Sequence, residues 1–520
     1  MPPPPPLGLD AARRLLNRAG YGPRPGELAA AARLALPDWL ERQLALPAEE
    51  PAVAAHLAGL TLPVRYVAGP GEQMVDEQRG LDSLAQPAAY RWALADFRRP
   101  IPFAERERPR VETVAATIAR KSVVEAVLRE RMVEFWHDHF AVSTQAGAFV
   151  FAMLPDHDRL IRAHALGNFT ALLEASATSP AMLAYLNNRS SRAGAPNENY
   201  ARELMELHTL GRDAYAAGAR TWREIPGAAE GRPQGYHDGD VWEAARAFTG
   251  WTLAAGQRVD AGLTLPASGA FAYVEKWHDG YQKRVLGQEL PPFAPAMADG
   301  RQVLAACARH PATARHLCTK LARFLIGDPP PPAAVARGIA AFARHAEAAD
   351  QIARTLRAML DGPEILGPAA GRVRRPLDAV AAASRALGIR LAPTPPLMSN
   401  MLLAGQLPFA WPAPDGQPVA GDTYLGATAL RARWGLLSAL AINAWGTGAS
   451  TLYAGLIGQE VRDAALALAA PMLDARAARP VADTIAATWA RRGGAPRIAT
   501  TGEAAGIAGW LLCAPAFQTT

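Results

Sequence analysis

The stretch ETVAATIARKSVVEAVLRERMVEFWHDH, residues 112–139, decides the fold class. Apolar residues recur in it with the period of a helix, and no proline or glycine interrupts it, so it predicts a long α-helix. A second block with the same period, ENYARELMELHTLG at 198–211, ends at Gly211, a residue suited to the left-handed position after a helix. The sequence therefore predicts a mainly α protein.

Helical periodicity continues on both sides of these two blocks. The pattern changes only at 252–290, where FAYVEKW and QKRVL flank Asp279-Gly280, a dipeptide that favours tight turns and so predicts a small β-hairpin. A proline-rich connector at 392–396 is the best domain boundary. We expect a main helical domain at 1–390 with the hairpin inserted at about 252–290, and a C-terminal helical part at 391–520 packed on it.

Composition excludes several classes of protein. Of the 520 residues, 50% are hydrophobic and 20% are charged, which indicates a packed chain rather than a disordered one. The net charge of +6 comes without a dense basic block interleaved with aromatic residues, which argues against nucleic-acid binding. The chain shows no apolar run of membrane-spanning length and no signal-peptide region at its start. These features predict a soluble protein without a membrane span, cytoplasmic by its sequence.

The first candidate site lies at the end of the 112–139 helix. Glu130, Glu134 and His137 share one helical stripe, with Asp138 at its edge. Glu134 and His137 form a Glu-x-x-His pair, the spacing with which di-iron carboxylate bundles present two ligands. His139 points to another side unless the helix ends at His137. The alternative is that the glutamates face arginines in water and the histidines are satisfied core groups.

The second candidate site lies on the 198–211 helix. Asn199, Arg202, Glu203 and Glu206 occupy one sector, with Arg202 and Glu206 at salt-bridge spacing. His208 lies nearly opposite this sector and joins it only if the last helical turn deforms. The alternative is a plain solvated face. A third candidate is His278 at the hairpin tip, which either overhangs a pocket or belongs to the turn alone.

Together these residues suggest a metal- or haem-dependent oxidoreductase with a His/Glu site between the two helices. The expected metal is iron, haem or non-haem, or copper, although a metal-free protein is also compatible with the pattern. The expected metal ligands are Glu134, His137, His139 and His208. The expected catalytic residues are Asp138, Arg202, Glu203, Glu206 and His278. Cofactor contacts are expected from Trp136 and Asn199.

Several blocks of the chain resemble a known bacterial family, the one catalogued as domain of unknown function 1800. They include FWHDHF (135–140), HALGNF (164–169), NENYARELMELHTLG (197–211), AFTGWTL (247–253), HDGYQKRVLG (278–287) and GQLPFAW (405–411). The resemblance implies a bacterial, often exported protein, frequently encoded beside a second family, number 1501, related to alkaline phosphatases and sulfatases.

That neighbouring family suggests a sulfatase-like partner, which would carry this chain to the periplasm by co-export if it has a Tat signal. It also supplies an alternative function, a non-catalytic partner or chaperone in which an Arg–Glu–His network only ties helices together. A metal-free hydrolase ranks third, because no activated nucleophile is visible in the sequence.

Overall fold

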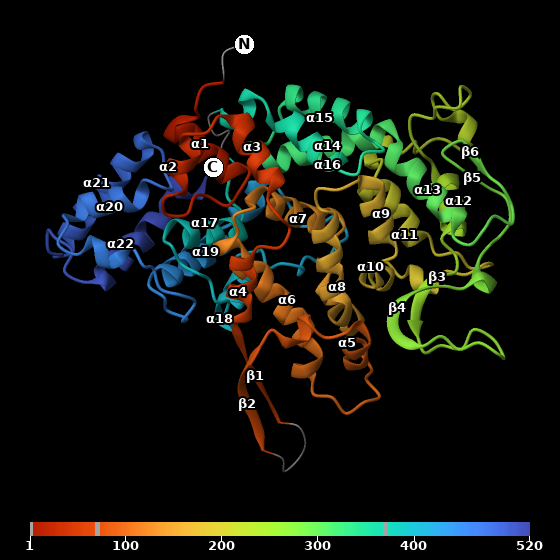
Figure 1. The fold of residues 1–520 in the computed structure, drawn as a ribbon, viewed down its shortest axis with the longest axis horizontal. Coiled ribbons are helices and arrows are strands. Elements are labelled where there is room, and N and C mark those ends of the chain that lie inside the picture. The colour runs from red at the N-terminus through yellow and green to blue at the C-terminus, as the bar shows by residue number, and fades with distance from the viewer. Residues whose placement is uncertain (1–3, 68–72, 368–371, 520) are drawn as a thin grey trace.

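The computed structural model describes residues 4–67, 73–367 and 372–519. These residues form twenty-three α-helices and three two-stranded antiparallel sheets (Figure 1). The mainly α class predicted from the sequence is confirmed. Proline occupies the first turn of eight of these helices, where its fixed φ favours the helix and its missing N–H costs nothing.

The larger of two hydrophobic clusters draws nearly all of its residues from the first 366 positions of the chain. Its helices are α1 (Gly8–Arg18), α2 (Glu27–Ala32), α3 (Leu36–Ala45), α4 (Pro51–Ala58), α5 (Ala88–Leu94), α7 (Val127–His139), α8 (Ala148–His164), α9 (Phe169–Ala177), α10 (Pro180–Tyr185), α11 (Glu198–Glu203), α12 (Asp238–Ala247), α13 (Ala298–Arg309), α14 (Pro311–Leu325), α15 (Pro332–Arg344) and α16 (Gln351–Leu360).

The second cluster holds the C-terminal helices. These are α17 (Pro376–Ala386), α18 (Pro395–Leu403), α19 (Ala427–Ala441), α20 (Val461–Ala469), α21 (Ala475–Arg491), α22 (Thr501–Cys513) and α23 (Pro515–Gln518). Helix α6 (Phe103–Val123) contributes to both clusters, with Ile118 in the second and Val123 in the first. The second cluster therefore already includes α17, ahead of the connector at 392–396. Among the described residues, no helix is long and apolar enough to cross a membrane.

The predicted 112–139 helix is two helices, α6 and α7, separated by residues 124–126. The carboxylate of Glu50 accepts hydrogen bonds from the backbone N–H groups of Glu125 and Ala126 at 2.9 and 2.8 Å. Gln43 accepts another from Leu128 N at 3.2 Å. Side chains from the α3–α4 region thus take up the free amides at the start of α7, which stabilises the break.

The β structure expected at 252–290 is present, but the predicted pairing around Asp279-Gly280 is wrong. Strand β3 (Trp251–Ala255) pairs with β4 (Ala267–Tyr273), and β5 (Lys283–Val285) pairs with β6 (Gln288–Leu290). The Asp279 carboxylate instead accepts two hydrogen bonds from Arg246 on α12, at 2.8 and 3.0 Å. This anchoring holds the dipeptide against α12, so the tight turn forms at Leu286-Gly287, where both φ angles are positive.

A further hairpin that the sequence analysis did not predict lies near the N-terminus. Strands β1 (Thr61–Val67) and β2 (Met74–Gly80) pair in antiparallel register and project from the body of the molecule (Figure 1).

Candidate functional site

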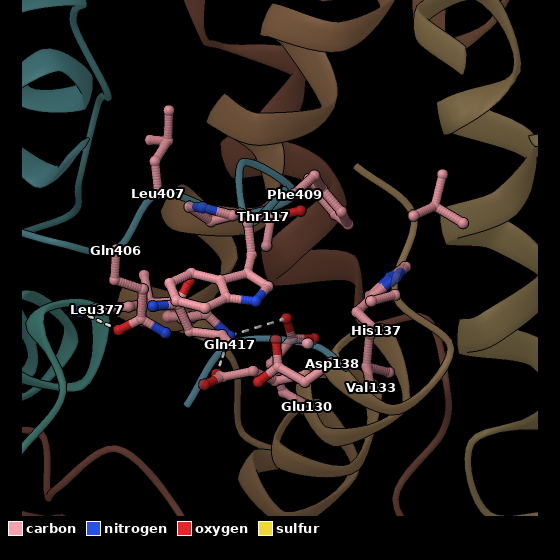
Figure 2. A pocket seen from close by; sticks show the side chains of 17 residues that line it. Thr117, Glu130, Val133, His137, Asp138, Leu377, Gln406, Leu407, Phe409 and Gln417 are labelled. Atoms are coloured by element: carbon pink, nitrogen blue, oxygen red, sulfur yellow. Dashed lines mark hydrogen bonds and ion pairs between the residues drawn. The ribbon is translucent and has the colours of Figure 1, made fainter. Parts of the chain in front are cut away.

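A pocket lies where the two hydrophobic clusters meet, over α7 (Figure 2). Helices α6 and α7 form one side of it, and residues 405–417, the loop between α18 and α19, form the other. The enclosed volume is about 40 Å³, enough for a few water molecules or one small polar group. In Figure 2, Glu130, His137 and Asp138 lie on the α7 side, and Gln406, Leu407 and Phe409 on the loop side.

Glu134 on α7 is the centre of a buried ionic network. Its Oε2 accepts hydrogen bonds from Tyr21 Oη at 2.6 Å and Lys121 Nζ at 2.7 Å, and its Oε1 accepts one from Arg375. Burial alone would raise the pKa of Glu134, but Lys121, Arg375 and Arg131 outweigh it and lower the pKa to about 2. Glu134 is therefore a paired carboxylate with both oxygens occupied.

Arg375 connects this network to the start of α17. Its guanidinium also donates to Asp138 Oδ2 at 3.0 Å and to Asp378 Oδ2 at 3.3 Å. Arg131 donates to the other oxygen of Asp378 at 2.5 Å. Cations from α6, α7 and α17 thus neutralise carboxylates from α7 and α17, so the network joins the two hydrophobic clusters.

His137 belongs to a second set of ion pairs on the same pocket wall. Its Nε2 donates to Asp158 Oδ1 at 2.9 Å, and Arg162 binds both Asp158 and Glu130, at 2.9 and 2.6 Å. Burial opposes ionisation of Asp158, but Arg162 and His137 hold its pKa well below the usual value. The predicted Glu134–His137 pair therefore faces one pocket, yet each side chain is taken up by a different partner.

Asp138 differs from the other two carboxylates of the pocket, Glu130 and Glu134, in the direction in which its pKa is shifted. Its side chain keeps 26% of its surface exposed, and only Oδ2 is held by Arg375. Burial raises the pKa of Asp138 to about 6, with the negative charge of Glu134 adding to the rise and Arg375 opposing it. Asp138 thus exchanges a proton near neutral pH, while the pKa values of Glu134 and Glu130 are lowered.

Three uncharged polar side chains complete the lining. Thr117 on α6 is 7% exposed, and its Oγ1 has no hydrogen-bond partner among the described residues. The amide nitrogen of Gln417 donates hydrogen bonds to Gly405 O and Tyr424 Oη, so its side-chain oxygen remains available to accept one from a ligand. The side-chain oxygen of Gln406 accepts a hydrogen bond from the backbone N–H of Leu377, so its amide hydrogens remain available to donate to a ligand. A ligand would thus meet a hydroxyl, an acceptor and a donor.

The last turn of the predicted 198–211 helix deforms. After α11 the backbone forms a π-helical turn, Leu204–His208, a distortion often found at functional sites. The wider turn places the His208 ring beside His139, with ring centroids 6.0 Å apart. Of the four expected metal ligands, His139 and His208 are therefore close together, but on the side of α7 away from Glu134 and His137, which line the pocket.

His139 is held as a neutral imidazole. Its Nε2 lies 2.9 Å from the backbone oxygen of His208, which only accepts, so this nitrogen carries the hydrogen. Its Nδ1 accepts a hydrogen bond from Lys320 Nζ at 3.0 Å. Burial, reinforced by Lys320, holds the pKa of His139 well below its usual value, and burial lowers the pKa of Lys320 to about 8.

The polar sector of α11 is a surface ion-pair cluster. Arg202 contacts Glu198 at 3.1 Å, Asp238 at 3.3 Å and Glu206 at 3.6 Å, with over a third of its own side chain exposed. Glu203 lies nearby, half-buried, with a pKa raised chiefly by burial and with Oε2 unpartnered among the described residues. These residues do not line the pocket beside Asp138.

The remaining predicted residues make structural contacts. Trp136 is buried and its indole N–H donates to Ala165 O at 2.9 Å. The Asn199 amide donates to Leu186 O at 3.1 Å. His278 bridges Thr249 O at 2.9 Å and Asp299 Oδ2 at 3.0 Å, beside strand β4 and outside the pocket.

The donor geometry gives little support to a metal centre. Within the part of the chain that the structure describes, no three His, Cys, Asp or Glu side chains are grouped so as to hold a metal ion. Glu134 is surrounded by cations, and both nitrogens of His139 are engaged. A metal ion at either place would have to displace an ammonium or a guanidinium group.

Sequence reasoning missed the cations of the site, Lys121, Arg375 and Lys320. Lys121 and Glu134 are 13 residues apart, a spacing that would not bring them together on one straight helix, and they meet because α6 and α7 are separate. Arg375 lies 241 residues from Glu134, in the run RVRRP before α17. The only available signal in the sequence was this cluster of arginines at a predicted helix start, which could pair with the predicted acidic stripe at 130–138.

Comparison with known families gives an extended match. The family described as protein of unknown function (DUF1800) matches residues 14–519, nearly the whole chain. Searches of curated proteins and of solved structures give no match. The family suggested by the sequence blocks is thus confirmed: this chain belongs to the DUF1800 family.

Proposed function

We propose that this protein is an enzyme that moves protons on a small polar substrate in the pocket beneath the 405–417 loop, with Asp138 as the acid–base group. The observation that carries the proposal is the place of Asp138 in the pocket: Arg375 holds only its Oδ2, and its pKa is raised to about 6, while those of the other lining carboxylates are lowered. A carboxyl group that is half protonated near neutral pH serves as either acid or base.

The pocket lining suggests the class of substrate and reaction. Thr117, Gln406 and Gln417 offer hydrogen bonds suited to hydroxyl and carbonyl groups. Among the described residues, no serine or cysteine lines the pocket, so the described lining offers no covalent nucleophile of these types. Proton transfer next to a carbonyl, or hydrolysis by an activated water, suits this set of groups. Arg375 would orient Asp138 through the hydrogen bond to Oδ2.

A fragment screen tests this proposal even though the substrate is unidentified. Small hydroxy and keto compounds are screened by ligand-observed NMR at pH 5 and pH 7.5, and binders are then checked for turnover by mass spectrometry. The wild-type protein should bind some fragments with affinities that differ about ten- to thirtyfold between the two pH values, the effect expected when binding depends on one proton of a group with a pKa of about 6.

Two variants test whether Asp138 causes this pH dependence and whether the fragments bind in the pocket. The pH dependence should vanish in Asp138→Asn, and binding itself should vanish in Ala141→Leu, which fills the pocket next to Val142. Binding that is absent in the wild-type protein, or that has the same pH dependence in Asp138→Asn, would overturn the proposal.

The metal- or haem-dependent oxidoreductase suggested by the sequence is a proposal with weaker support. Its best remaining observation is that the rings of His208 and His316 lie 6.0 and 6.2 Å from that of His139. Metal analysis and an absorption spectrum of untagged protein purified without chelator test it. Stoichiometric iron or copper, or a Soret band, lost in His139→Ala but kept in His345→Ala, would favour it over proton transfer.

A second candidate function is that of a non-catalytic partner of a sulfatase-like protein, exported together with it. The saturated pairing of Glu134 and Asp378 favours it, because such a network has a structural use without any substrate. Exposed Val67 and Met74 on the β1–β2 hairpin offer apolar surface for a partner. Co-expression with the neighbouring sulfatase-like protein, followed by size-exclusion chromatography and cell fractionation, distinguishes this function by a stable, exported complex.

A further inference from the structure

A second, larger cavity is lined mainly by α13 and the start of α14. In Figure 1, α13 and strand β6, which also contributes to the cavity wall, lie at the end of the molecule opposite α20–α22. The walls of the cavity come from the C-terminal half of α13, the start of α14, strand β6 and residues 231–234. Its volume is about 710 Å³, within the range of sites that take metabolites. It shares no lining residue with the pocket beside Asp138.

The charge of this cavity is strongly one-sided. Arg232, Arg309 and Arg315 line it, and no aspartate or glutamate in the described part of the chain does. Arg309 contacts Glu347 at 2.8 Å, but both side chains are more than half exposed, so the pair is weak. Within 4–67, 73–367 and 372–519, the side chains of Arg232 and Arg315 take part in no ion pair or hydrogen bond.

Three carboxylates on the neighbouring elements already bind other groups. Only alternate residues of a strand face one side, so Gln288 lines the cavity while Glu289 pairs across the hairpin with Arg284. Asp299 at the start of α13 binds Lys283 at 2.7 Å. Asp240 accepts a hydrogen bond from Leu286 N at 2.7 Å. Glu230, which precedes the segment 231–234, does not line the cavity, so among the described residues the three arginines face no carboxylate in the cavity wall.

The wall between residues 231–234 and α14 is fixed by His310. Its Nδ1 accepts the hydrogen bond of Ala312 N at 3.1 Å, which caps α14, and its Nε2 donates to Pro233 O at 2.9 Å. Gln234, Gln288 and Gln302 add carboxamide groups to the three guanidiniums. The cavity thus combines a fixed wall with many hydrogen-bond donors.

We propose that this cavity binds a small ligand that carries two or more oxyanion groups, as phosphate or sulfate esters. Guanidinium groups match such oxyanions in geometry and donate paired hydrogen bonds to them. Three of them around one cavity accommodate several such groups at once, and the carboxamides suit the hydroxyl or carbonyl oxygens between them. This site is separate from the proposed acid–base pocket and does not depend on its function.

Isothermal titration calorimetry with two probes tests the proposal, sodium tripolyphosphate for phosphate and sucrose octasulfate for sulfate. At an ionic strength near 0.1 M, where exposed charges are largely screened, at least one probe should bind saturably. Arg232→Ala and Arg315→Ala should each weaken that binding about tenfold, as expected for a lost charge-assisted contact. The probe that binds more tightly indicates whether the ligand carries phosphate or sulfate esters.

Arg479→Ala is the matched control, because Arg479 is exposed on α21 at the other end of the molecule and its loss changes the net charge equally. It should leave the affinity unchanged. Failure of both probes to bind the wild-type protein would overturn the proposal. So would an equal loss of affinity in Arg479→Ala, which would mark the binding as unspecific attraction to a basic protein.

Discussion

At the scale of single residues, the site is defined by which carboxylates are paired. Glu134 is enclosed by Lys121, Arg375 and Tyr21 and stays ionised. Asp138, one helical turn further on, keeps one oxygen free and has a pKa of about 6. The contrast follows from the number of cations within hydrogen-bond reach, and it separates a structural carboxylate from a reactive one.

Lys121→Met should destabilise the protein by about 3 kcal/mol, because it leaves buried negative charge on Glu130 and Glu134 less compensated. Urea unfolding monitored by circular dichroism measures this change. Lys276→Met removes an exposed ion pair with Asp260 and should leave the free energy of unfolding nearly unchanged, because water screens such pairs. Equal losses in the two variants would contradict the buried network described for Glu134.

At the scale of elements, the pocket depends on the close approach of the 405–417 loop to α7. Gly416 has a φ of +78°, and a Cβ added there would lie 1.8 Å from the backbone oxygen of Asp138. The loop is further tied down by Phe409 O, which accepts hydrogen bonds from the backbone N–H and the hydroxyl of Thr144 at 2.8 and 2.9 Å. The wall opposite Asp138 is therefore set by backbone contacts.

Gly416→Ala should lower the free energy of unfolding by about 2 kcal/mol or more, through the strained φ and the clash with Asp138. It should also displace the loop and abolish fragment binding in the pocket. Gly435→Ala is the control: it lies inside α19 with open space around it and should stabilise the protein by about 0.5–1 kcal/mol. Thermal and urea unfolding of both variants compare the two positions.

The elements also show how far the sequence determines this site. Helix periodicity predicted the α class and the stripe of Glu134, His137 and Asp138, which does line one pocket. It did not predict the break between α6 and α7, because Glu50 and Gln43, which stabilise it, come from a distant part of the chain. Local pattern fixes which residues share a helix face, whereas the partners of that face depend on tertiary packing.

The π-helical turn is a second example of this limit. An ideal α-helix places His208 opposite Glu203, and the sequence contains no glycine or proline in the turn to signal a distortion. In the structure His208 packs against Phe140 and His139, with ring centroids 5.1 and 6.0 Å away. Contacts between distant segments favour the wider turn, and helix periodicity carries no information about them.

At the scale of the whole molecule, the acid–base pocket lies between two hydrophobic clusters, and the cluster of His139, His208 and His316 lies inside the larger one. Burial lowers the pKa of His208 to about 3 and that of His316 to about 4, with Lys320 adding to both shifts. The folded protein therefore holds these imidazoles neutral at pH values where an unfolded chain binds protons.

Stability should consequently fall as the pH is lowered from about 6.5 toward 4. Histidines with lowered folded pKa values bind more protons in the unfolded state, so the free energy of unfolding rises with pH across this window. Asp138, with its raised pKa, acts in the opposite direction between about 4 and 6. The histidines with lowered pKa values outnumber the carboxyl groups with raised pKa values, Asp138, Glu112 and Glu203, so we expect a net loss of stability on acidification.

Urea unfolding at pH 7 and pH 5 measures that loss. The difference between the two pH values should be smaller in His208→Gln than in the wild-type protein, whatever the stability of the variant itself. His345→Gln, outside the cluster, should keep the full difference. An unchanged difference in His208→Gln would show that other groups carry the acid sensitivity.

The most direct test of the central claim is the pKa of Asp138, measured by carbon-13 NMR of the aspartate carboxyl groups and assigned with Asp138→Asn. The account predicts an apparent pKa of about 6, which should fall in Glu134→Gln because that substitution removes the neighbouring negative charge. A pKa below about 4, the value of an ordinary aspartate, would contradict the account and leave the pocket without an acid–base group.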